Sequence, residues 1–232
     1  MCDICASLEK CPDYIVQMIE KQLVAKEQRS DEWLLARRRM ITASDVPTLL
    51  GENYPQNPSN LLYQKTLGII GNDRCGSTPQ NEAMMWGTKW ESDAAEEFKK
   101  QTGHKVVFTG LLRHATIETL GASPDGITWC GCALEIKCPF KKIGKSLKTI
   151  PQRYKSQVET QLSVTGFQKA YFVQYRPPGY GDEGVTCPEN TKCVFFCLEY
   201  NRDKNWEDHA LPIIERFSND MHRVLLSYEK VL

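Results

Sequence analysis

Helix-forming and strand-forming stretches alternate along this sequence. Their order predicts a mixed α/β fold (α+β), in which helices flank a mixed central sheet. Helical patterns dominate up to Gln101, β-rich runs begin at Lys105, and further helices separate and follow the later strands. The composition agrees, because 41% of the 232 residues are hydrophobic and 25% are charged, as in ordinary globular domains. The chain is long enough to bury one sizeable core.

The amino-terminal part is predicted to be helical. Residues 12–29 carry an apolar stripe formed by Ile15, Met18, Ile19 and Leu23, which favours an amphipathic helix. A second element runs from Asp31 to Arg39. Residues 42–47 indicate the start of another helix, with Ser44 as its N-cap and a proline in its first turn. We expect residues 1–29 to form a cysteine-bearing segment with a helix, and residues 30–232 to form a single domain.

Two more helices are expected before the first strands. Residues 54–58 and 71–80 are rich in Pro, Asn and Gly and are predicted to be loops around a short helix at 59–67. A longer helix is predicted from Thr88 to Gln101, closed by Gly103. The capping-box spacing from Thr88 to Glu91 would place Glu91 in the first turn of that helix.

The second half contains most of the predicted sheet. A helix is expected at 151–166 and a final amphipathic helix at 206–228. The β-rich runs lie at residues 105–108, 110–113, 127–129, 133–138, 169–175 and 193–200.

Several classes of protein are disfavoured by the sequence. It has no apolar run of 18 residues, and its start lacks the basic and apolar regions of a signal peptide, so we expect an intracellular protein without a membrane partner. It also has no glycine-rich phosphate loop, which argues against an ATP-driven motor.

The ten cysteines are therefore expected to be free thiols. Cys2, Cys5 and Cys11 near the start could meet Cys187, Cys193 and Cys197 near the end in a zinc or iron–sulfur site, although the spacings match no standard pattern. The four histidines are scattered, and the sequence assigns them no chemistry.

The strongest chemical signal is an acidic and basic cluster on a predicted hairpin. Asp125 lies in a Pro-Asp-Gly turn, and Glu135 and Lys137 are two residues apart on the next strand, so both point to one face. The hairpin would carry Asp125 to within ligand distance of Glu135. Hard oxygen donors of this kind suit Mg²⁺, or alternatively Mn²⁺. Taken singly, each residue could instead be part of an ordinary turn or a solvated strand face.

Further motifs occur in a fixed order around this cluster. The five segments are MITASD at 40–45, WGTKWE at 86–91, SPDG at 123–126, LEIKCP at 134–139 and QVETQL at 157–162. In order and spacing they resemble the lambda-exonuclease-like, YqaJ-type viral recombinase family of the PD-(D/E)xK nuclease superfamily. The resemblance spans about residues 30 to 200 and implies a restriction-endonuclease-like PD-(D/E)xK core.

The resemblance also implies roles for individual residues. Glu91, Asp125, Glu135 and the backbone carbonyl of Ile136 would hold metal. Lys137 and Gln157 would position the attacking water, and Gln161 shares the helical face of Gln157. Arg37 and Ser44 would bind a terminal 5′ phosphate, with Arg38 and Arg39 as alternatives to Arg37.

Charge patterning adds a candidate DNA track. The net charge is zero, but Lys141, Lys142, Lys145 and Lys148 belong to a basic run without an acidic residue. Such a run can follow a phosphate backbone, or it can be a solvated surface.

Together these features predict a Mg²⁺-dependent deoxyribonuclease. The resemblance favours a 5′-to-3′ exonuclease on double-stranded DNA ends that leaves 3′ single strands for recombination or end processing. An endonuclease or nickase on the same fold, and a non-catalytic DNA-binding module, are the alternatives. The resemblance leaves two protein partners open, a single-strand annealing protein and further copies of the chain in a ring-shaped trimer.

Overall fold

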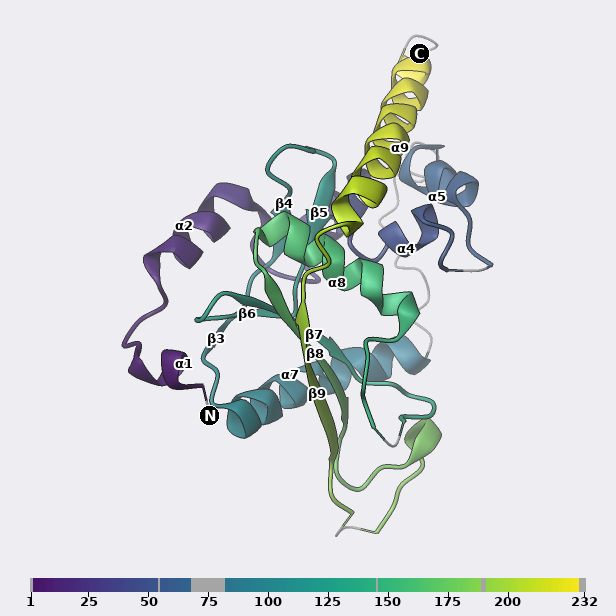
Figure 1. Ribbon diagram of the computed structural model, residues 1–232. Coiled ribbons are helices and arrows are strands. Elements are labelled where there is room, and N and C mark those ends of the chain that lie inside the picture. Colours follow the sequence, from purple (N-terminus) through teal and green to yellow (C-terminus); the bar gives the residue numbers. More distant parts are fainter. Residues whose placement is uncertain (1, 54, 68–81, 145, 189–190, 230–232) are drawn as a thin grey trace.

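A five-stranded mixed sheet forms the centre of the computed structural model, which describes residues 2–53, 55–67, 82–144, 146–188 and 191–229 (Figure 1). Its strands, in spatial order, are β3 (Val106–Val107), β6 (Gly126–Thr128), β7 (Cys132–Lys137), β8 (Lys169–Arg176) and β9 (Val194–Asn201). β7 and β8 are parallel and the other neighbours are antiparallel. The predicted mixed sheet is therefore confirmed.

A second sheet lies beside the first one. It has the order β1 (Leu23–Ala25), β4 (Leu111–Arg113), β5 (Leu120–Ala122) and β2 (Ile41–Thr42). The sequence did not predict β1, β2 or β5, and the helix predicted over 12–29 is wrong in its second half. That helix, α2 (Asp13–Gln22), ends where the chain pairs with β4, because pairing there buries Ala25 in the core.

Two helices cover opposite faces of the central sheet. They are α7 (Glu82–Thr102) and α8 (Gln152–Thr165). Leu134 and Ile136 of β7 pack with Phe98 of α7, whereas the alternating Ala133 packs with Val158 of α8. Glu135 and Lys137 therefore point to the α8 side of the sheet.

The start of α7 differs from the sequence prediction. The helix begins at Glu82 rather than Thr88, so Glu91 lies in its third turn and cannot close a capping box. Its end agrees with the prediction, because Gly103 has a φ of 72° and its N–H donates to the carbonyl of Lys99.

The remaining helices surround this core (Figure 1). They are α1 (Asp3–Ser7), α3 (Asp31–Arg39), α4 (Val46–Leu49), α5 (Pro58–Lys65), the 3₁₀ turn η1 (Asp182–Gly184) and α9 (Trp206–Glu229). α9 contacts α4 and α5, is buried in the core as far as Met221, and its last turns extend away from the body of the molecule. Within the described ranges, no helix is both long and apolar enough to cross a bilayer. The loop predicted at 71–80 lies outside the described residues.

Candidate active site

One cavity of roughly 690 Å³ gathers side chains from α3, α7, α8 and the β6–β7 hairpin. Most of the functional residues predicted from the sequence line it. These are Arg37, Ser44, Glu91, Asp125, Glu135, Ile136, Lys137, Lys141, Lys142 and Gln157. Lys148 is exposed and does not line the cavity, and Lys145 lies outside the described part of the chain.

The hairpin places Asp125 next to the Glu-x-Lys strand. β6 and β7 pair with Gly126 opposite Leu134, and the N–H of Asp125 donates to the carbonyl of Leu134 at 2.9 Å. The N–H of Ile136 in turn donates to Oδ2 of Asp125 at 2.6 Å. Burial, together with the neighbouring carboxylates of Glu135 and Glu91, raises the pKa of Asp125 well above its usual value. Asp125 thus sits where a cation would relieve repulsion between carboxylates.

Glu135 is held by three side chains although only 1% of the residue is exposed. Lys137 Nζ lies 2.5 Å from Oε1, and Gln157 Nε2 donates to the same oxygen at 2.7 Å. Gln161 Nε2 donates to Oε2 at 2.5 Å. Both glutamines come from α8, one helical turn apart. A buried carboxylate needs such partners to remain charged.

Lys137 shares this pocket with the acidic residues. Burial opposes its charged form, but the carboxylates of Glu135 and Asp125 outweigh that effect and raise the pKa of Lys137 to about 12. Its Nζ also lies 5.0 Å from the centre of the Tyr154 ring. The side chain is therefore a fixed cation beside the carboxylates.

Glu91 reaches the cavity from α7 and has a partner that the sequence did not reveal. Arg29 Nη2 donates to its Oε2 at 2.6 Å. Arg29 adopts a left-handed φ of 69°, which is uncommon for a residue other than glycine. It precedes α3 in a stretch without a motif, so no local pattern could have identified it.

Arg37 and Ser44 meet at another part of the cavity wall. Arg37 Nη2 donates to Ser44 Oγ at 3.0 Å, and its guanidinium lies 4.3 Å from the centre of the Trp33 ring. The prediction that Ser44 is an N-cap is wrong. Asp45 occupies the N-cap position of α4, and Ser44 Oγ instead contacts Thr42 Oγ1 at 3.0 Å. The Ser44 hydroxyl therefore faces Arg37 and not a helix terminus.

The loop after β7 brings the first two lysines of the basic run to the cavity. The buried guanidinium of Arg176 fixes this loop by donating to the backbone carbonyl of Lys141. The other terminal nitrogen of the guanidinium, Nη1, pairs with Oδ1 of Asp182 in η1 at 2.5 Å. Arg153 also lines the cavity and lies 4.7 Å from the centre of the Tyr154 ring.

The cysteines meet in a different combination from the predicted one. Cys2 and Cys5 lie next to His104 and Cys130, so His104 has cysteine neighbours that the sequence did not indicate. Cys11 instead packs at the edge of the core around Ile15. Cys193 and Cys197 pack on the α7 side of the central sheet. Sequence spacing could not show this, because His104 and Cys130 are far from the amino terminus along the chain.

The donor set fits a hard divalent cation. Carboxylates of Glu91, Asp125 and Glu135 line one cavity, and the backbone of Ile136 lines it with them. A mixed sheet that presents an Asp and a Glu-x-Lys pair in this way has the fold of the PD-(D/E)xK superfamily.

Comparison with known proteins narrows this class. The family model for the YqaJ-like viral recombinase domain matches the sequence over residues 32–168, which is more than half of the chain. The protein therefore belongs to this family. Among curated relatives, YqaJ of Bacillus subtilis is 34% identical over 152 residues and R354 of Acanthamoeba polyphaga mimivirus is 28% identical over 179 residues; both are described as uncharacterized. The matches cover 63% and 69% of this chain, but only 46% and 31% of the relatives, so the chain spans less than half of their length.

Solved structures share the fold over most of the chain. The alkaline exonuclease LHK-Exo of Laribacter hongkongensis matches with a TM-score of 0.65 and 26% identity, covering 87% of this chain and 97% of that one. Its complex with dAMP matches over the same shares with a TM-score of 0.67 and 27% identity. A phage-related exonuclease of Haemophilus somnus, at 12% identity and a TM-score of 0.57, shows the fold alone; its match covers 82% of this chain and 95% of that one.

Proposed function

We propose that this protein is a Mg²⁺-dependent exonuclease that degrades one strand of double-stranded DNA from its 5′ end and leaves a 3′ single strand. The observation that carries the proposal is the common cavity of Asp125, Glu135 and Lys137, which Arg37 and Ser44 also line. Membership of the YqaJ-like viral recombinase domain family and the similarity to LHK-Exo, an alkaline exonuclease, support it.

Glu91, Asp125, Glu135 and the carbonyl of Ile136 would hold Mg²⁺, for which Mn²⁺ could substitute. When bound, the metal supplies Lewis acidity toward the phosphodiester and lowers the pKa of water. The hydrogen bond from Ile136 N to Asp125 Oδ2 orients that carboxylate. Gln161 holds one oxygen of Glu135 and thereby fixes the carboxylate plane.

Lys137 and Gln157 are the residues that would position the nucleophile. Both already point at Oε1 of Glu135, at 2.5 and 2.7 Å, so a water beside that oxygen would lie within reach of a cation and an amide. The cation would favour the deprotonated water that attacks phosphorus. Glu135 and Gln157 would keep a lone pair of this water directed at the phosphate.

Arg37 and Ser44 would recognise the end of the duplex. A guanidinium and a hydroxyl 3.0 Å apart can both donate to one terminal phosphate. Trp33 stacks on Arg37 and limits its motion. Binding the terminal phosphate at one part of the cavity would bring a nearby phosphodiester to the carboxylates.

Digestion of linear duplexes labelled at either end, beside a covalently closed circle of the same sequence, tests the proposal. We expect progressive loss of the 5′ label from linear DNA in Mg²⁺, no cleavage of the circle, and no digestion in EDTA. Nicking of the circle would favour the endonuclease alternative. Binding of DNA without cleavage, in Mg²⁺ and in Mn²⁺, would favour the alternative of a non-catalytic DNA-binding module.

A further inference from the structure

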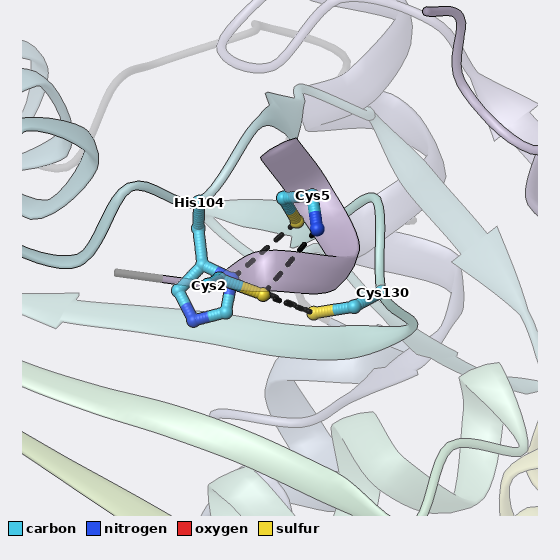
Figure 2. A group of neighbouring side chains, drawn as sticks. All are labelled: Cys2, Cys5, His104 and Cys130. Carbon is cyan, nitrogen blue, oxygen red and sulfur yellow. Dashed lines mark hydrogen bonds between the residues drawn. The ribbon is translucent and has the colours of Figure 1, made fainter. Parts of the chain in front are cut away.

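Four side chains capable of binding a soft metal converge outside the candidate active site (Figure 2). Cys2 directly precedes α1, and Cys5 lies within that helix. His104 lies between α7 and β3, and Cys130 lies in the β6–β7 turn. One ligand atom from each lies within 4.8 Å of those of the other three. Cys5 and His104 are buried, at 0% and 6% exposure.

Three of the distances between these ligand atoms match a single tetrahedral centre. Zinc bonds of about 2.3 Å to sulfur and about 2.05 Å to nitrogen place two sulfurs about 3.8 Å apart, and a sulfur and a nitrogen about 3.5 Å apart. The Sγ atoms of Cys2 and Cys130 are separated by 3.9 Å. His104 Nδ1 lies 3.5 Å from Cys5 Sγ and 3.4 Å from Cys130 Sγ.

We propose that Cys2, Cys5, Cys130 and His104 bind one Zn²⁺ ion in a structural Cys₃His site. All four ligand positions would be supplied by protein, which is the arrangement of a structural rather than a catalytic zinc. The site is separate from the carboxylate cavity, so it does not depend on the proposed nuclease activity.

Two other uses of the cysteines fit the geometry less well. The ligands of an iron–sulfur cluster are distributed over several iron atoms, and so spread wider than four atoms that all lie within 4.8 Å. A disulfide between Cys2 and Cys130 would join two sulfurs at about 2.05 Å and leave Cys5 and His104 without a role. A single ion explains why all four side chains point to one place.

The surroundings hold the ligands in place for a metal. The His104 ring stacks on Phe98 with centroids 5.4 Å apart and packs against Tyr171 at 4.6 Å, which fixes its orientation with Nδ1 toward the sulfurs. The N–H of Cys2 donates to the carbonyl of Thr102 at 2.9 Å. Cys2 is thus already joined to the end of α7.

A metal here would connect three parts of the chain that are distant in sequence. It would join the amino-terminal segment and the end of α7 to the turn of the β6–β7 hairpin. That hairpin carries Asp125 at one end and Glu135 on its second strand. We therefore expect the zinc to stabilise the amino-terminal segment and the hairpin together.

Metal analysis of the full chain, purified with reductant and dialysed against Mg²⁺, tests the proposal. We expect about one zinc per chain. The double variant Cys5→Ser/Cys130→Ser should lose this zinc, and the matched control Cys11→Ser should retain it. His104→Cys should also retain zinc, because a fourth thiolate can replace the imidazole.

Cobalt substitution of the wild type provides a readout that needs no variant. Co²⁺ bound by three thiolates gives intense visible bands and a thiolate charge-transfer band, whereas Co²⁺ in the carboxylate cavity gives neither. Removal of the metal by a chelator should lower the Tm of the wild type, but not that of Cys5→Ser/Cys130→Ser. Iron with acid-labile sulfide, a Cys2–Cys130 disulfide, or a wild type without zinc and without the cobalt spectrum would overturn the proposal.

Discussion

Glu135 shows how a single residue connects the fold to the proposed chemistry. Its carboxylate is nearly inaccessible, and a buried charge is tolerated only when it is paired and hydrogen-bonded. Lys137 supplies the pairing from the same strand, and Gln157 and Gln161 supply the hydrogen bonds from α8. The arrangement keeps a carboxylate oxygen and a cation at fixed positions before any substrate arrives.

Replacing Lys137 by alanine should lower the rate of cleavage by about 10²–10⁴-fold, since it removes the cation proposed to favour deprotonated water. Glu135→Ala should abolish cleavage, because a metal ligand is removed. Binding of duplex DNA in Ca²⁺ should change little in either variant. Digestion assays and binding titrations measure the two effects, with Lys148→Ala as a surface control. A Lys137→Ala enzyme with normal turnover would exclude the proposed site.

The identity of the metal provides another test at this scale. Ca²⁺ should support DNA binding but little cleavage, because its larger and more flexible coordination shell would misplace the water. Mn²⁺ should restore cleavage. Parallel assays of binding and digestion in each metal distinguish the two effects, and rapid digestion in Ca²⁺ would argue for another mechanism.

The sequence predicted that Asp125, Glu135 and Lys137 meet because these three residues are close to one another in sequence. Glu135 and Lys137 alternate on one strand, and a short hairpin returns Asp125 to them, so strand periodicity and turn chemistry were sufficient. Arg29 reaches Glu91 across 62 positions, and Cys2 reaches Cys130 across 128. Contacts of that range depend on the tertiary fold, and no spacing rule describes them.

At the scale of elements, the errors occur where tertiary pairing decides. Residues 23–25 continue the pattern of α2, yet they form β1 because the edge of β4 is available to pair with them. β2 and β5 are two and three residues long and carry too little alternation to be detected. The long helices α7 and α8 were predicted because their periodic patterns and terminal glycines are strong local signals.

The corrected role of Ser44 makes end recognition easier to test. Linear duplex with a 5′ phosphate should be degraded faster than the same duplex with a 5′ hydroxyl, and this preference should shrink in Arg37→Ala and in Ser44→Ala. Ser44 does not cap α4, so its replacement should avoid the loss of about 1 kcal/mol that removing an N-cap causes.

Initial rates on the two substrates, measured beside the Tm of each variant, separate recognition from stability. Arg39→Ala serves as a control, because Arg39 lies on the same helix but does not line the cavity. Equal rates on both ends in the wild type would contradict the assignment.

The molecule as a whole is electrically neutral, with 29 basic and 29 acidic residues, so a general electrostatic attraction to DNA cannot account for the proposed DNA binding. The cavity instead combines both signs. Lys141, Lys142 and Arg153 line it together with the carboxylates, and Arg176 holds the loop that carries the two lysines. A DNA backbone could follow the cations while one phosphate meets the acidic residues. The trimer and the annealing partner stay predictions.

The contribution of these lysines can be measured through salt. Each phosphate of duplex DNA that a variant no longer neutralises should reduce the slope of log K against log salt by about 0.9, because fewer counterions are released on binding. Lys141→Gln/Lys142→Gln should therefore weaken binding and flatten the slope, whereas Lys148→Gln, outside the cavity, should leave it unchanged. Binding titrations over a range of salt concentrations, in Ca²⁺ to prevent cleavage, give the slopes. If both variants keep the wild-type slope, the lysines face solvent and the DNA path must follow Arg153 and Arg37 instead.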